Sequence, residues 1–158
     1  MQKRKLPRLR NFDYSSAKIY FVTFNCHEGL HLLGEIIESN TNIFKFSKIG
    51  FIADKCVQDI EAHYPGVQVL SYVIMPNHVH ILISLINAEK AVNLSTIIGA
   101  CKSTITREAR IEYPGIILWQ KSFNDHIIRD EKDYLTHGEY IEINVQRWKK
   151  DKYFTWFE

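Results

Sequence analysis

The sequence is poor in cysteine and has no segment apolar enough to cross a membrane. Its three cysteines, Cys26, Cys56 and Cys101, lie far apart and form no CxxC pair, so neither a zinc ribbon nor a disulfide framework is expected. No apolar run approaches the roughly 18–20 residues of a transmembrane helix. The basic N-terminus is not followed by the apolar stretch of a secretory signal. We therefore expect a protein of the reducing cytoplasm that has no membrane partner.

Internal repeats, low-complexity segments and linkers are also absent, which favours a single domain. The chain has 158 residues, of which 46% are hydrophobic and 24% are charged. That is enough to bury a core without disulfides or a structural metal, in an ordinary soluble globular protein. We expect a basic N-terminal arm over residues 1–16 and one folded domain over residues 17–158.

The formal net charge of +2 conceals an uneven distribution. Residues 1–10 hold five basic side chains and no acidic one. Subtracting those five from the 20 lysines and arginines leaves 15 basic against 18 acidic residues, so the rest of the chain is slightly negative. A nucleic acid would therefore be bound by local patches and by the arm rather than by a globally basic surface. A solvated terminus without a partner explains the arm equally well.

Hydrophobic periodicity predicts alternating strands and helices. Runs of β-branched and aromatic residues predict strands over residues 17–24, 67–74 and 79–85, with 125–129 as a fourth strand or an extended link. Apolar residues at helical spacing predict helices over residues 46–62, 94–112 and about 131–149, the first with Ser47 as N-cap. Residues 25–42 are expected to form a turn-rich loop. The order β-α-β-β-α-β plus a C-terminal helix predicts an α+β, ferredoxin-like antiparallel sheet whose crossover helices leave one face free.

The segment Met75-Pro76-Asn77-His78-Val79-His80 carries the most chemical information. Side chains alternate between the two faces of a strand, so His78 and His80 should share the face opposite Val79. Two neutral imidazoles on a rigid strand supply two of the three protein ligands of a divalent metal site. Two half-exposed histidines without a metal are the alternative that this spacing alone leaves open.

The last predicted helix offers groups that could complete such a site. At about 100° per residue, an apolar stripe runs along this helix, and Tyr140 and Asn144 lie one turn apart at its edge. A phenol near a divalent metal favours phosphodiester transesterification, because the ion can stabilise charge developing on the phosphate. The tyrosine oxygen, whose pKa is ordinarily about 10, would attack phosphorus and form a covalent protein–DNA ester. Taken alone, Tyr140 could also be a packed helix tyrosine and Asn144 a helix cap.

These segments together resemble one protein family. Residues 75–80 resemble the HUH motif of the single-tyrosine transposases, especially the REP-associated tyrosine transposases. The resemblance continues through residues 119–120, 123–129 and 140–144, and so covers most of the predicted domain. It implies a ferredoxin-like HUH fold and cleavage of single-stranded DNA next to a hairpin, with Mg²⁺ or Mn²⁺ and a 5′-phosphotyrosine intermediate.

The resemblance also implies roles for individual residues. His78 and His80 match the metal-ligating histidines, Tyr140 matches the nucleophile, and Asn144 matches the residue that completes the metal shell. One position departs from the family pattern, because Val145 stands where a proline usually follows the asparagine. Valine should let the last helix continue to about residue 150, since proline tends to end a helix.

Contacts to DNA and assembly are less sharply predicted. Basic or aromatic side chains that could position DNA are Lys102, Arg107, His126, Arg129 and Arg147. A solvated helix face or, for His126, a structural role explains them as well. The family includes monomers and dimers, and the short C-terminal segment favours a homodimer. Two other functions remain open: a metal-dependent phosphodiesterase that activates water, and a non-catalytic protein that binds single-stranded DNA hairpins.

Overall fold

The structure is a computed structural model that describes residues 18–85 and 92–150. Its centre is a four-stranded antiparallel sheet in the order β4-β5-β1-β6. The strands are β1 (Lys18–Asn25), β4 (Val67–Ile74), β5 (His78–Leu85) and β6 (Asn124–Ile127). The predicted ferredoxin-like α+β fold is confirmed. The predicted basic arm, residues 1–16, lies outside the described residues.

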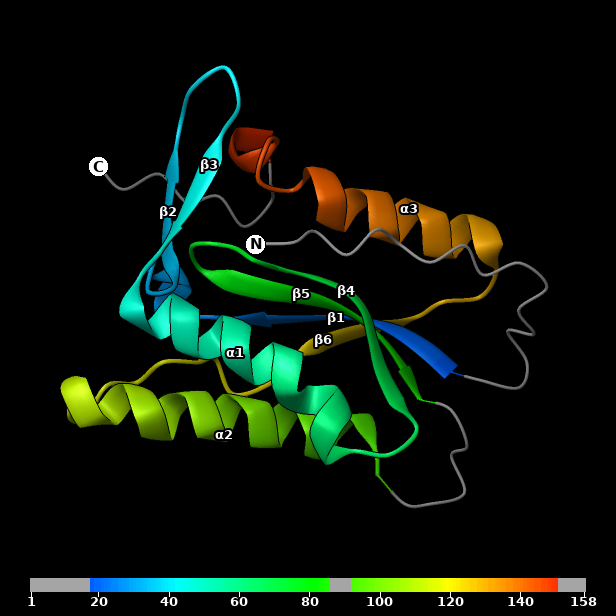
Figure 1. The fold of residues 1–158 in the computed structure, drawn as a ribbon, viewed down its shortest axis with the longest axis horizontal. Coiled ribbons are helices and arrows are strands. Elements are labelled where there is room, and N and C mark those ends of the chain that lie inside the picture. The colour runs from blue at the N-terminus through cyan, green and yellow to red at the C-terminus, as the bar shows by residue number, and fades with distance from the viewer. Residues whose placement is uncertain (1–17, 86–91, 151–158) are drawn as a thin grey trace.

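Helices cover both faces of this sheet. Figure 1 shows α1 (Lys48–His63) and α2 (Leu94–Glu112) on one face and α3 (Glu131–Ile143) on the other. The larger core lies between the sheet and the pair α1–α2, and a smaller core lies under α3. In β5, Val79, Ile81 and Ile83 enter the larger core, as the alternation of side chains predicts. The face expected to be free for a site is therefore the face that α3 covers.

Local sequence signals account for the two crossover helices. Ser47 caps α1 by accepting a hydrogen bond from the Gly50 backbone N–H at 3.0 Å, as predicted. Asn93 caps α2 in the same way through the N–H of Thr96, at 2.8 Å. The predicted bounds of α2, residues 94–112, are those of the structure.

The segment predicted as a turn-rich loop, residues 25–42, contains one strand and the turn of a β-hairpin, so that prediction was wrong. Strands β2 (Gly34–Ile37) and β3 (Ile43–Phe46) pair with each other in a separate two-stranded sheet. Each strand has only four residues, and neither shows the long alternating run that identifies a strand from sequence. The hairpin stands out from the main sheet toward the C-terminal end of α3 (Figure 1).

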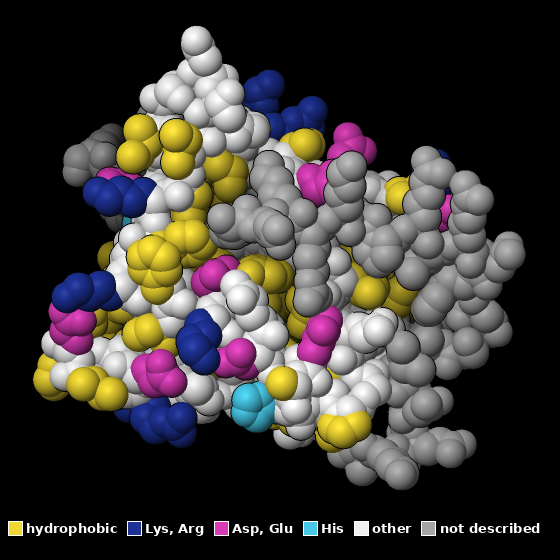
Figure 2. All heavy atoms as spheres, viewed as in Figure 1, with side chains coloured by type: hydrophobic (Ala, Val, Ile, Leu, Met, Phe, Trp, Pro, Cys, Tyr) yellow, Lys and Arg dark blue, Asp and Glu magenta, His cyan; other side chains and the backbone are white. Residues whose placement is uncertain are grey.

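Hydrophobic side chains gather on the surface of this hairpin and of the first turn of α1 (Figure 2). Phe51 is 61% exposed and stacks on Phe46, with ring centroids 5.0 Å apart. Ile43 and Ile37 are also exposed.

Among the described residues, none of the helices combines the length and the hydropathy that a membrane crossing requires.

The last helix ends earlier than predicted. Helix α3 stops at Ile143, and only a short 3₁₀ turn, Trp148–Lys150, follows. Hydrogen bonds to the hairpin explain the difference: Gln146 Nε2 donates to Asn42 O and Gln146 Oε1 accepts from Asn42 N, both at 2.8 Å. Asn42 Nδ2 also donates to Val145 O, at 3.3 Å. The chain thus leaves the helix without a proline, because tertiary contacts engage residues 145–146.

Candidate active site beneath the third helix

The two histidines of the motif lie together on the α3 face of the sheet. The ring centroids of His78 and His80 are 4.5 Å apart with an interplanar angle of 71°. Their exposed fractions are 0% and 1%. Two histidines on an uncovered strand would be half exposed. Here α3 and the neighbouring aromatic rings bury both of them.

Each histidine ring is oriented through its Nδ1 atom. His80 Nδ1 lies 2.7 Å from Thr23 Oγ1, and His78 Nδ1 lies 2.8 Å from Asn77 Oδ1. Asn77 Nδ2 donates to the carbonyl of Gly29 at 3.3 Å, which fixes the amide so that its oxygen faces His78. His78 Nδ1 is therefore the protonated nitrogen, and the lone pair of a neutral ring resides on Nε2. A histidine held at one nitrogen by an oxygen acceptor is the usual arrangement of a metal-ligating imidazole.

Helix α3 brings Tyr140 to the same place. The ring of Tyr140 is 5.2 Å from that of His80 and meets it edge to face, at 66°. Phe21 lies beside both rings, 5.0 Å from His80 and 6.1 Å from Tyr140. Tyr140 is half-buried, so its side chain can still be reached from solvent. Residues 60 positions apart in the sequence thus form one cluster.

The end of α3 lies over the other histidine. Asn144 is the C-cap residue of α3 and is only 2% exposed. Trp148, which is 5% exposed, stacks on His78 with a centroid separation of 6.1 Å and an interplanar angle of 27°. Helical periodicity in the last predicted helix gave no sign of this contact between Trp148 and His78.

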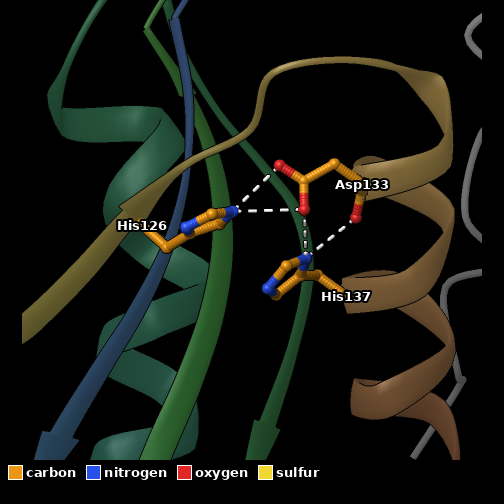
Figure 3. Close-up of side chains that lie close together, drawn as sticks. All are labelled: His126, Asp133 and His137. Atoms are coloured by element: carbon orange, nitrogen blue, oxygen red, sulfur yellow. Dashed lines mark hydrogen bonds and ion pairs between the residues drawn. The ribbon is translucent and has the colours of Figure 1, made fainter.

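A second polar cluster joins β6 to the start of α3. In Figure 3 the rings of His126 and His137 both point toward the carboxylate of Asp133. His126 Nε2 lies 2.9 Å from Asp133 Oδ2, and His137 Nδ1 lies 3.1 Å from Asp133 Oδ1. His126 was predicted either to position DNA or to have a structural role; the structure shows it paired with Asp133, and a contact to DNA stays a prediction. No role was predicted for Asp133 or His137, although their i, i+4 spacing on a predicted helix places them on one side of that helix.

The carboxylate of Asp133 is held in its charged form. Burial raises its pKa, but the Arg129 backbone N–H (3.0 Å from Oδ2) and His126 and His137 together outweigh burial and lower that pKa. The Arg129 guanidinium Nε lies 3.7 Å from the same oxygen and its side chain is 77% exposed. Arg129 therefore touches this cluster through both its backbone and its side chain.

Two of the residues predicted to bind DNA lie on the opposite side of the sheet. Lys102 and Arg107 belong to α2 and line a surface pocket of about 470 Å³ together with Arg110 and Trp119. Lys102 Nζ donates to the carbonyls of Gln120 (2.7 Å) and Ser122 (3.2 Å), so it anchors the loop before β6. Burial lowers the pKa of Lys102. The structure does not bring these side chains to the histidines, and Arg147 is exposed just after α3.

Sequence comparison identifies the family. Residues 40–144, more than half of the chain, match the IS200-like transposases, and the chain belongs to this family. A Haemophilus influenzae protein of uncharacterised function is 29% identical over 170 residues, which cover 96% of this chain and 93% of that protein. A second H. influenzae protein, provisionally named a REP-associated tyrosine transposase, is 29% identical over 142 residues, covering 84% and 72% of the two chains. The family resemblance noted from the sequence is confirmed.

Solved structures show the same fold. A REP-associated tyrosine transposase bound to a REP hairpin has a TM-score of 0.63 and 23% identity, over 85% of this chain and 70% of that one. A Deinococcus radiodurans protein, provisionally assigned as a transposase, has a TM-score of 0.53 and 18% identity, over 90% and 96% of the two chains.

Proposed function

We propose that this chain cleaves and rejoins single-stranded DNA near hairpins, with Tyr140 as the nucleophile. The observation that carries the proposal is the position of Tyr140, whose ring lies 5.2 Å from that of His80 in a member of the IS200-like family. The tyrosine is half-buried while His78 and His80 are fully buried. A phosphodiester approaching from solvent would therefore meet the phenol at the edge of the site.

The reaction is a transesterification. The Tyr140 oxygen forms a bond to phosphorus, and the bond between phosphorus and the 3′ oxygen breaks. The phenol proton leaves as the new ester forms, and the departing oxygen takes up a proton to become a 3′-OH. The 5′-phosphotyrosine conserves the energy of the broken bond, so a 3′-OH can attack it in the reverse direction and rejoin DNA.

His78 and His80 would hold a divalent ion through Nε2, with the Asn144 amide oxygen as a third ligand. The Nδ1 contacts to Asn77 and Thr23 fit this use, because a neutral ring that donates a hydrogen bond through Nδ1 carries its lone pair on Nε2. Mg²⁺ or Mn²⁺ bound there would neutralise charge on the phosphate as the bond to phosphorus forms. Two imidazoles and one amide oxygen suit Mn²⁺ better than Mg²⁺.

Single-stranded DNA with hairpin structure is the partner that the family and the fold support. The matched transposase of known structure is bound to a REP hairpin. Phe21, half-buried beside the site, is an aromatic side chain of the type that stacks on unpaired bases. Arg129 and Arg147, both exposed at the two ends of α3, are suited to contact the phosphates on either side of Tyr140. The homodimer expected from the sequence stays a prediction, which sedimentation of the purified chain would test.

A denaturing gel tests the proposal. The chain would be incubated with Mn²⁺ and labelled single-stranded hairpins from the DNA flanking its own gene, beside the variants Tyr140→Phe and Tyr113→Phe. Tyr113 is a matched control because it is 42% exposed at the end of α2, across the sheet from the histidines. We expect an adduct stable to heat and detergent with the wild type and Tyr113→Phe, and none with Tyr140→Phe.

Other outcomes would point to other functions. Cut DNA without an adduct would favour a phosphodiesterase that activates water. Tight binding that needs no metal and produces no cut would favour a non-catalytic hairpin-binding protein. An adduct that persists in Tyr140→Phe would show that another residue is the nucleophile.

A further inference from the structure

We propose that His126, Asp133 and His137 form a second metal site, which takes a transition ion of the Zn²⁺ class and joins β6 to α3. This site is separate from His78 and His80, and its existence does not depend on the proposed reaction. It rests on the geometry of three side chains that the reaction does not use (Figure 3).

The ligand atoms are close enough to share one ion. One ligand atom from each of His126, Asp133 and His137 lies within 4.8 Å of the other two. The His126 Nε2–Oδ2 and His137 Nδ1–Oδ1 distances are 2.9 and 3.1 Å. Zinc bonds of about 2.0–2.2 Å in a tetrahedral shell place neighbouring ligand atoms roughly 3.3 Å apart. Small rotations of the side chains would open the cluster around an ion.

The backbone already fixes the positions of these side chains. Asp133 and His137 are four residues apart on α3, so they project from the same side of the helix. His126 belongs to β6, where it is the register partner of Phe21 on β1 and faces α3. His137 Nδ1 also lies 2.8 Å from the backbone oxygen of Asp133, and coordination through Nδ1 would replace that hydrogen bond. An ion would also replace the contacts that His126 Nε2 and His137 Nδ1 make to the carboxylate, because each of these nitrogens must present a lone pair to the metal.

Donor chemistry and access determine the class of ion. Two imidazole nitrogens and one carboxylate oxygen suit Zn²⁺, Co²⁺ or Ni²⁺, whereas Mg²⁺ prefers oxygen ligands alone. The side chains of His126, His137 and Asp133 are 39%, 23% and 12% exposed. Solvent can therefore reach the cluster and supply a fourth ligand. Arg129 is the one cation in contact with the carboxylate among the described residues, and its largely exposed guanidinium is free to move away.

Such an ion would fix the position of α3, the helix that carries Tyr140, relative to β6. His137 precedes Tyr140 by one turn of α3, and its ring lies 4.7 Å from that of Phe21. Phe21 in turn contacts the rings of both His80 and Tyr140. An ion that joins α3 to β6 at His137 would therefore also fix His137 against Phe21, and through Phe21 the rings of His80 and Tyr140. If the proposed function is correct, the ion would position the nucleophile without contacting the DNA.

Zinc titration by calorimetry tests the site. The first variant is His78→Gln/His80→Gln, which removes the other histidine pair and should still bind one Zn²⁺. Adding His137→Gln should weaken that binding by about 100-fold or more, because a three-ligand site becomes a two-ligand one. Adding His63→Gln is the matched control. His63 Nδ1 makes the same 2.8 Å contact to the backbone oxygen of Asp59, four residues earlier in α1, without belonging to a three-residue cluster among the described residues.

A second measurement covers the case in which the double variant does not fold. In the otherwise native chain, His137→Gln should bind one Co²⁺ or Zn²⁺ fewer than the wild type, while His63→Gln should bind the same number. Zn²⁺ should also raise the Tm of the wild type more than that of His137→Gln. Equal metal stoichiometry and equal Tm shifts in the wild type and His137→Gln would overturn the proposal. The same conclusion would follow if adding His137→Gln to the double variant left its Zn²⁺ affinity unchanged.

Discussion

The hydroxyl of Thr23 lies 2.7 Å from Nδ1 of His80, across the neighbouring strands β1 and β5. The two residues are direct register partners in the sheet, so strand pairing itself sets this contact. Phe21, two residues earlier on the same face of β1, stacks on the His80 ring. The orientation of a candidate metal ligand is thus fixed by backbone pairing rather than by a flexible loop.

Thr23→Val should therefore weaken Mn²⁺ binding at the histidine pair. Valine keeps the shape of threonine but cannot hydrogen-bond Nδ1, and loss of such a partner weakens metal binding by about 10–100-fold. Electron paramagnetic resonance of free Mn²⁺ measures the affinity, with Thr23→Ser as the control that keeps a hydroxyl. Equal affinities in the wild type and Thr23→Val would exclude a role for Thr23 in metal binding.

Two glycines of the crossover helices should respond in opposite ways to alanine. A methyl group at Gly50 would overlap the carbonyl oxygen of Leu33, while one at Gly99 meets no atom within 4 Å. We expect Gly50→Ala to lower the free energy of unfolding by about 1–3 kcal/mol or more, through overpacking. Gly99→Ala should raise it by about 0.5–1 kcal/mol, because alanine is the better helix former. Urea unfolding measures both, and a destabilised Gly99→Ala would contradict the packing described.

The cysteines should differ in reactivity. Cys26 and Cys101 are buried, and burial raises the pKa of Cys26 to about 12. Cys56 is half-buried, and the neighbouring Cys101 thiol lowers its pKa. We expect one thiol to react rapidly with a disulfide reagent at pH 8 in the native chain, and all three after denaturation. Cys56→Ser should remove the rapid phase. Rapid labelling of two thiols would contradict the burial of Cys26 or Cys101.

Cys26 should also cause the free energy of unfolding to fall at alkaline pH. Its pKa rises on folding from 9.0 to about 12, so its contribution is complete below pH 9 and is lost as the pH rises toward 12. Between pH 8 and pH 10.5 this loss is about 2 kcal/mol. The decline in unfolding free energy over that interval should be smaller by this amount in Cys26→Ala. Equal declines in the two proteins would show that the thiol ionises equally in the folded and unfolded chains.

Long periodic segments could be predicted from the sequence, and short ones could not. The 19-residue helix α2 and the strand β4 have the predicted bounds, because their apolar spacing extends over the whole element. The four-residue strands of the β2–β3 hairpin carry no such signal. The end of α3 depends on hydrogen bonds between Asn42 and Gln146, 104 residues apart, which no local pattern encodes.

The same distinction applies to the candidate site: features set by one strand or one helix could be predicted, and contacts between elements could not. The shared face of His78 and His80 follows from the alternation along one strand, and Tyr140 lies beside His80 where helical periodicity placed it at the edge of the packed stripe. The pairing of His126 with Asp133 requires β6 to lie against α3, which is a tertiary fact. Lys102 and Arg107 are basic in the sequence, but only the fold shows that α2 covers the other face of the sheet.

Mass spectrometry of the DNA-linked peptide tests the central claim most directly. Trypsin would release residues 133–147 of the adduct as one peptide, which contains both Tyr134 and Tyr140. Fragmentation of this peptide, after the DNA is trimmed to a nucleotide, should place the 5′-phosphate on Tyr140, since Tyr134 is only 1% exposed in the core under α3. A nucleotide on Tyr134, or on a peptide from elsewhere in the chain, would contradict the account.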